Sequence, residues 1–101
     1  MLSEARDPDA ALALLGGILA QETDPARRTV LERRARELVV ERDLQFLEKG
    51  LERYREKTGS LPVELQDLVR EGILPAVPRE PNGGRYLLEG GGKVRSDRFD
   101  R

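Results

Sequence analysis

The feature that most constrains this chain is a long segment, Pro25 to about Lys57, that contains no internal proline. Gly50 is its only weak position, because glycine in a helix interior costs about 1 kcal/mol relative to alanine. Thr58-Gly59 ends the segment, since glycine supplies the left-handed conformation that favours a helix C-terminus. The sequence therefore predicts one long helix around which the rest of the chain must fold.

The apolar face of this predicted helix changes direction along its length. In the first half the apolar side chains share one side, and in the second half they lie nearly half a turn away. The first set is Leu31, Ala35, Leu38, Val39 and Phe46, and the second is Leu44, Leu47, Leu51 and Tyr54. A heptad pattern drifts much more slowly. We therefore expect the preceding helix to cover the first half and the C-terminal segment to cover the second. A bend near Arg42-Asp43 that lets one core follow the stripe is the alternative.

A shorter helix is predicted ahead of the long one. Asp7-Pro8 begins it, because Asp accepts hydrogen bonds from the amides of the first turn and Pro tolerates the first helical position. It runs to about Glu22, and the same dipeptide at Asp24-Pro25 begins the long helix. So short a connection predicts an antiparallel helical hairpin. Its spacing is about half of the roughly 34-residue tetratricopeptide period, so a helical-repeat adaptor is an alternative interpretation.

The segment after Gly59 is predicted to form short elements. A third helix is expected over roughly Pro62 to Glu71, with Leu65, Leu68 and Val69 as its buried stripe. A proline-rich connector leads to the turn 81–84, and residues 85–89 and 93–96 alternate as strands of a β-hairpin around three glycines. Two strands alone are marginal in water, so this hairpin must pack on the long helix or recruit strands from another chain.

These elements predict an α+β fold that is mainly α. We expect a single domain over residues 1–101, with a helical hairpin at 7–43, a second part at 44–96 and a frayed tail at 97–101.

Several spaced residues after the middle of the long helix carry a family resemblance. They are the segment Leu51 to Pro62, with Tyr54, Gly59 and Pro62 in the pattern Tyr-x-x-x-x-Gly-x-x-Pro, and then Leu65, Leu68, Val69, Ile73, Leu74, Pro78, Pro81, Gly83, Gly84 and Tyr86. From Leu44 to Ser96 the chain resembles the globular domain of the major pseudopilins of type II secretion and of type IV pilin-like proteins. In that family a long helix leads through a short helix and a proline-rich loop to a small antiparallel sheet packed on the long helix.

The matching residues are predicted to be structural or interaction residues. Tyr54 and Leu61 would close the core where the helix ends, Gly59 would permit the reversal, and Tyr86 would pack onto the long helix. The full set of candidates is Leu47, Leu51, Tyr54, Gly59, Pro62, Leu65, Leu68, Pro81 and Tyr86.

The chain also departs from the pseudopilin pattern. An acidic start and a helical hairpin stand where the family has a processed segment and an apolar anchor, so assembly as a pilin is not expected. Glu80-Pro81-Asn82-Gly83 replaces the family's Asp-Pro-Trp-Gly, and no room follows Ser96 for its calcium loop. Asp97 and Asp100 are too few for Ca²⁺, which takes six to eight oxygen ligands. Neither a metal nor another cofactor is therefore expected.

Composition argues against several classes of function. The chain has no His and no Cys, so acid-base chemistry would fall to Asp and Glu alone, and an enzyme is not expected. Lys plus Arg number 18 and Asp plus Glu 19, for a net charge of −1, which gives no bulk attraction for nucleic acid. The longest apolar run, Ala10 to Ala20, is shorter than the roughly 20 residues of a membrane-spanning helix.

The remaining class is a protein-protein interaction or assembly module. The resemblance implies a place in a bacterial envelope or secretion-related protein, and both periplasm and cytosol are compatible with a chain that lacks cysteine. The partner is expected to be a protein, and self-association through the hairpin edge is a further expectation. A tetratricopeptide-like adaptor is the alternative. A winged-helix DNA binder is less favoured, because the predicted third helix carries Glu64, Asp67 and Glu71.

Overall fold

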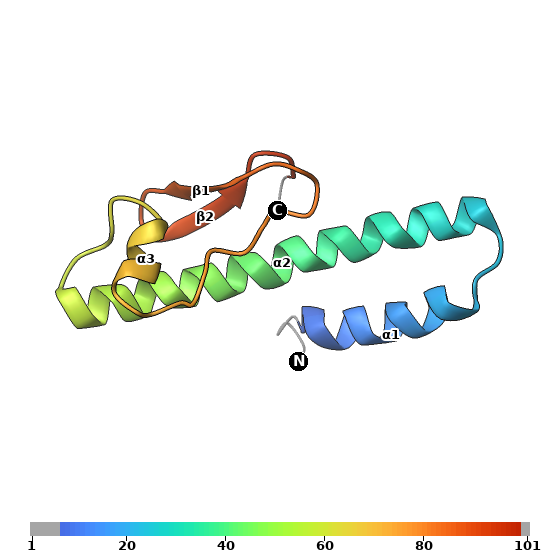
Figure 1. The fold of residues 1–101 in the computed structure, drawn as a ribbon, viewed down its shortest axis with the longest axis horizontal. Coiled ribbons are helices and arrows are strands. Elements are labelled where there is room, and N and C mark those ends of the chain that lie inside the picture. The colour runs from blue at the N-terminus through green and yellow to red at the C-terminus, as the bar shows by residue number, and fades with distance from the viewer. Residues whose placement is uncertain (1–6, 100–101) are drawn as a thin grey trace. The chain divides into compact units, whose positions relative to one another are not determined.

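The computed structural model of this chain describes residues 7–99. In chain order its elements are α1 (Pro8–Gln21), α2 (Pro25–Thr58), α3 (Gln66–Arg70), β1 (Tyr86–Glu89) and β2 (Lys93–Ser96), which Figure 1 shows as a ribbon. The predicted α+β class, mainly α, is confirmed. The chain divides into two compact units, Met1–Arg42 (unit 1) and Asp43–Arg101 (unit 2), and the boundary falls inside α2.

Unit 1 is a helical hairpin in which α1 lies alongside the first half of α2 (Figure 1). Both helices begin where the Asp-Pro pairs predict. The Asp7 side chain accepts a hydrogen bond from the N–H of Ala10 at 3.1 Å, and Asp24 Oδ1 accepts one from the N–H of Ala26 at 2.9 Å. These aspartates satisfy amides that have no partner inside the helix, which is why the helices start there.

The connection between α1 and α2 is held by charged side chains. Arg28 Nη1 donates to the carbonyl oxygen of Leu19 at 2.7 Å, which satisfies an acceptor at the end of α1. Glu22 accepts from the N–H of Asp24 at 3.0 Å and pairs with Arg27 at 3.2 Å. The Asp24 amide and then the Arg27 side chain lower the pKa of the Glu22 carboxyl.

The buried face of α2 rotates as predicted, but it does so earlier. Leu38 is 5% exposed on the first face, while Val40 already lies on the second. Phe46 was predicted to belong to the first stripe and is 43% exposed. That assignment is wrong, because by residue 46 the buried face of the helix has already moved to the side that carries Leu44 and Leu47.

The core of unit 2 forms around the second half of α2. Leu44, Leu47, Leu51 and Leu68 are all fully buried. Gly50 lies on the same helix, and a Cβ at that position would come within 3.3 Å of Leu68 Cδ1 and 3.4 Å of Leu74 Cδ2. The glycine that is a weak helix former therefore lets α3 and the residues after it approach α2 closely.

Helix α3 is shorter than predicted. It spans Gln66–Arg70, whereas the sequence pattern placed its start at Pro62 and its end at Glu71. The reason is the Asp67 carboxylate, whose Oδ2 accepts from the N–H groups of Val63 and Glu64, both at 3.2 Å. These bonds satisfy the amides without helical geometry, so the residues after Pro62 form a turn instead.

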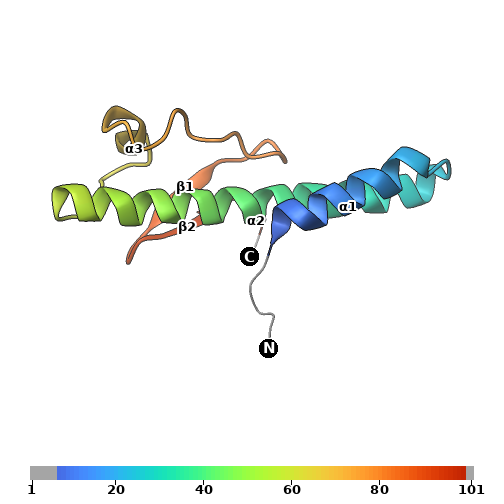
Figure 2. The same ribbon diagram turned by 90° about the horizontal axis from the view of Figure 1, so that it is seen from below.

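Strands β1 and β2 form the predicted antiparallel hairpin, with Tyr86 opposite Ser96 and Glu89 opposite Lys93. Gly91 and Gly92 both have positive φ in its turn, a conformation that other residues rarely adopt. The hairpin packs on α2, and one contact between them is the hydrogen bond that the Tyr86 hydroxyl donates to Asp43 Oδ2 at 2.6 Å. Figure 2 shows the hairpin and α3 along this half of the helix.

The tail that was predicted to be frayed is partly hydrogen-bonded. The N–H of Asp97 donates to the carbonyl oxygen of Arg85 at 2.9 Å, and Asp97 Oδ1 accepts from the N–H of Arg85 at 2.7 Å. A Cβ at Gly84 would overlap the side chains of Asp97 and Arg98, so glycine is required there for the tail to pass. The predicted fraying is wrong at residue 97, and Asp100 lies outside the described residues.

Candidate protein-interaction site

Most of the predicted site residues are parts of the scaffold. Leu47, Leu51 and Leu68 are fully buried, and Leu65 and Tyr86 are each 9% exposed. Pro62 is also buried, whereas Tyr54 and Pro81 are half-buried and Gly59 is an exposed residue with positive φ. Only Leu65 and Tyr86 among them also line the groove described next.

An open groove of about 800 Å³ runs along one side of β1 in unit 2. Its walls are residues 63–66, 77–80 and 84–88, and we call it the β1 groove. Val63 at its rim is 92% exposed, and Leu87 and Leu88 are half-exposed along the strand. Large apolar side chains exposed together beside a strand are typical of a surface that binds protein.

The backbone of β1 presents hydrogen-bonding groups to this groove. In an antiparallel pair, residues alternate between those bonded to the facing strand and those whose N–H and C=O point away from it. The N–H of Asp97 donates to the carbonyl oxygen of Arg85, so the odd-numbered residues of β1 are the ones hydrogen-bonded to β2. Leu88 therefore directs its N–H and C=O away from β2, and no other residue of the described chain is hydrogen-bonded to them.

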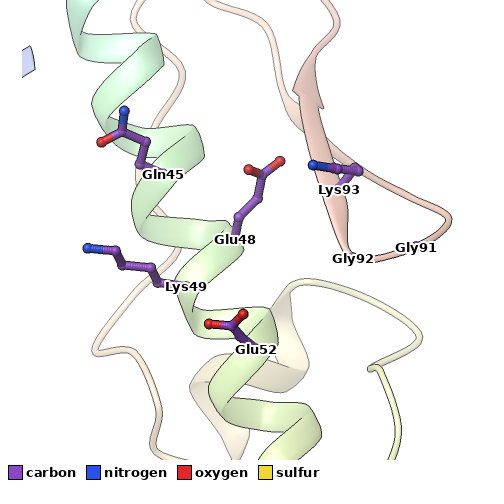
Figure 3. Close-up of a pocket in the computed structure, with 7 residues that line it drawn as sticks. All are labelled: Gln45, Glu48, Lys49, Glu52, Gly91, Gly92 and Lys93. Atoms are coloured by element: carbon purple, nitrogen blue, oxygen red, sulfur yellow. The ribbon is translucent and has the colours of Figure 1, made fainter. Parts of the chain in front are cut away.

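The outer edge of β2 is different, because a side chain occupies it. By the same alternation the N–H of Val94 points away from β1, and it donates to Glu48 Oε2 at 2.9 Å. Figure 3 shows Glu48 reaching from α2 toward this strand. The hollow here, of about 410 Å³, is lined by polar or charged side chains and glycine: Gln45, Glu48, Lys49, Glu52, Gly91, Gly92 and Lys93. Charged side chains and a capped edge disfavour the addition of a strand.

A buried carboxylate supports one wall of the β1 groove. Glu80 is 3% exposed, and it accepts from Ser96 Oγ at 2.6 Å, from the Gly84 N–H at 3.3 Å and from Asn82. Burial alone would raise the pKa of Glu80, but the hydrogen bonds from Ser96 and Asn82 together outweigh it, so the pKa lies below the usual value for Glu. Glu80 thereby joins the turn 81–84 to the end of β2.

Sequence reasoning did not identify the polar residues that organise this site. For Asp43 the sequence did contain an indication, because a carboxylate on the same helical face as the buried Leu44 and Leu47 needs a polar partner. Glu80 occupies the position of the Asp in the pseudopilin pattern, but that pattern does not reveal its bond to Ser96. Glu48 had no signal, since its partner is a backbone group far along the chain.

Unit 1 carries a second exposed apolar surface. On α1, Pro8 and Leu15 are buried, whereas Leu14 is 70% exposed and Ile18 is 45% exposed. Asp9 is the only charged residue within α1. A helix that is apolar around most of its circumference is usually covered by other protein.

No group of three or more acidic side chains between residues 7 and 99 is arranged to hold a metal ion. Within the same residues, no helix has both the length and the apolar character needed to cross a membrane. No protein-family model matches the chain, and searches of curated proteins and of solved structures find no match.

Proposed function

We propose that this chain is a non-enzymatic protein-interaction and assembly module that binds an extended segment of another protein along the β1 groove. The observation that carries the proposal is the open edge of β1, where the outward N–H and C=O of Leu88 lie beside exposed apolar side chains. Strand addition of this kind takes its affinity from main-chain hydrogen bonds and its specificity from alternate side chains.

The two edges of the hairpin support this choice of site. Glu48 caps the outer edge of β2, so an added strand would have to displace a charged hydrogen bond there. The β1 edge requires no such displacement at Leu88. The added strand would also extend a two-stranded sheet, which by itself is marginal in water. The resemblance of residues 44–96 to pseudopilin globular domains is compatible with a role in assembly within a bacterial envelope or secretion-related protein.

The test uses short random peptides displayed on phage and selected on the full chain. Binders are compared on wild type, Leu88→Pro and Leu88→Ala. Proline removes the N–H that faces the groove and leaves the bonds between β1 and β2, whereas alanine keeps that N–H and shortens the side chain. We expect Leu88→Pro to lose about tenfold or more in affinity, the equivalent of one hydrogen bond, and Leu88→Ala to lose less.

The fold of each variant is checked by circular dichroism, and chemical shifts map the peptide on wild type. If Leu88→Pro does not fold, N-methyl-leucine introduced at position 88 by semisynthesis removes the same donor without a proline ring. Binders that tolerate loss of the donor, or that map outside the β1 groove, would overturn the proposal.

The helical-adaptor alternative has one observation in its favour, the exposed apolar face of α1. In that case the partner would be an apolar helix packed against Leu14 and Ile18. The double variant Leu14→Ser, Ile18→Ser would then abolish peptide binding, and Leu88→Pro would leave it unchanged.

A further inference from the structure

We infer that the segment bound in the β1 groove is β1 of a second copy of this chain, antiparallel to the first, with Leu87 opposite Leu87. The inference rests on the proposed function and specifies its partner. It is carried by a charge pattern along β1 that becomes complementary when the strand meets its own copy.

The backbone alternation limits how two β1 strands can pair. Even-numbered residues such as Leu88 carry the groups that point into the groove. Hydrogen bonds between two copies must therefore join even-numbered residues to even-numbered residues. Neighbouring registers that satisfy this condition differ by a shift of two residues, which leaves a small number of candidates.

Only one of these registers pairs opposite charges. With Leu87 opposite Leu87, Arg85 of each copy lies opposite Glu89 of the other. Moving the copy by two residues in either direction places Arg85 opposite Leu87 or Gly91 instead. Opposite charges directly across a strand pair favour their register, and this register contains the pair twice.

The side chains are available for this pairing. Arg85, Leu87 and Glu89 share one face of β1, since strand side chains alternate, and this is the face opposite to Tyr86, whose hydroxyl reaches Asp43 of α2. Arg85 is exposed and forms no ion pair with any residue between 7 and 99. Glu89 pairs with Arg95 of its own hairpin at 2.6 Å and keeps 47% of its side chain exposed, so it can accept from a second guanidinium.

The resulting contact has two-fold symmetry, so each copy gives and receives the same interactions. The two hairpins together form one four-stranded antiparallel sheet with β1 at its centre. Its outer edges are the two β2 strands, and each of these is capped at Val94 by Glu48. The assembly therefore stops at two copies and does not extend into a fibre.

The test is a charge exchange between two chains, followed by analytical ultracentrifugation. In Arg85→Glu, positions 85 and 89 are both acidic, and in Glu89→Arg both are basic, so each variant repels its own copy. We expect wild type to dimerise and each variant alone to weaken the dimer by about tenfold or more. An equimolar mixture should restore the dimer, because every pair across the interface is again of opposite charge.

Cysteine cross-linking tests the register independently, because the chain has no natural cysteine. Leu87→Cys should form a disulfide between copies, since directly opposed residues in an antiparallel pair lie within disulfide reach. Arg85→Cys alone should not, whereas Arg85→Cys mixed with Glu89→Cys should cross-link. This measurement also applies if Glu89→Arg, which loses the contact with Arg95, does not fold.

A wild type that stays monomeric at millimolar concentration, or a mixture that does not recover the dimer, would overturn self-pairing in this register. If peptides still bind through the Leu88 N–H in that case, the proposed function survives and only the identity of the partner is wrong. If the peptides fail as well, both are wrong.

Discussion

Unit 1 and unit 2 use the two halves of α2 in different ways. Unit 2 buries Leu44, Leu47 and Leu51 completely and adds the buried carboxylates Asp43 and Glu80, which are hydrogen-bonded to Tyr86 and Ser96. Unit 1 holds one other helix against α2, and that helix leaves Leu14 and Ile18 exposed. Unit 2 therefore has a core of its own, whereas unit 1 is a hairpin with few buried side chains.

Hydrophobic composition is therefore a poor guide to where a core forms in this chain. Helix α1 contains one charged residue, yet only Pro8 and Leu15 of it are buried. The second half of α2 is rich in charge and supplies the fully buried leucines. The two helical segments differ in how much of their surface other elements cover. From Asp43 onward α2 is packed by both α3 and the β-hairpin, and a helix can bury only the faces that other elements cover.

Truncation of a buried leucine should separate the two units most strongly. Leu47→Ala removes a fully buried side chain from unit 2, so we expect the free energy of unfolding to fall by about 2–5 kcal/mol. Leu14→Ala in unit 1 should change it by no more than about 0.5 kcal/mol, since that side chain is 70% exposed. Urea titrations followed by circular dichroism measure both values, and equal losses would remove the contrast between the units.

A buried hydroxyl tests whether polar contacts distinguish unit 2. Tyr86→Phe removes the donor to the buried carboxylate of Asp43, and we expect a loss of about 1.5–3 kcal/mol, the range for hydrogen bonds to charged groups. Tyr54→Phe is the matched control, because the Tyr54 hydroxyl makes no hydrogen bond within residues 7–99. The two variants should differ in thermal unfolding, and identical melting curves would mean that the Asp43 contact adds no stability.

Two helical glycines extend the comparison to backbone positions. Gly50→Leu should destabilise unit 2 by about 1–3 kcal/mol through overpacking, because Leu68 and Leu74 lie against this glycine. Gly17→Ala should stabilise unit 1 by about 0.5–1 kcal/mol through helix propensity, since a Cβ there meets nothing within 4 Å. Calorimetry would record opposite shifts in Tm, and a gain for Gly50→Leu would show that this approach of elements is loose.

The smallest expected effect is the pH dependence that Glu80 gives to the stability of unit 2. The pKa of Glu80 is lower in the folded chain than its usual value, so the carboxylate stabilises the fold above the usual range of Glu and this contribution is lost as pH falls through the lowered value. Glu80→Gln should therefore flatten the acid side of the stability profile. Glu56→Gln, at an exposed position, is the control and should leave the slope as in wild type.

Local patterns were sufficient for most of the secondary structure. The Asp-Pro pairs, the absence of proline over the long helix and the glycines that follow α2 and α3 determine the bounds of these helices through contacts between near neighbours in the chain. The predictions failed where a side chain competed with the helix, as Asp67 does ahead of α3, or where the covering element decided burial, as at Phe46.

The candidate site was less accessible from the sequence. An exposed hairpin edge was expected, but which edge remains open depends on Glu48, whose partner Val94 is distant along the chain. Arg85 and Glu89 are visible in the sequence as opposite charges four residues apart. That spacing predicts a pairing between copies only when the residues of β1 that direct their backbone groups away from β2 are known.

The amino-acid sequence is enough to predict a long helix whose apolar face rotates, a helical hairpin that includes its first half, and a β-hairpin after it. These follow from periodicity, capping and turn chemistry, which act over a few residues. Tertiary packing accounts for the other features: the second half of α2 forms a core, α1 is partly uncovered, and β1 keeps an open edge. Burial and edge exposure depend on which distant segments meet, and no local pattern contains that information.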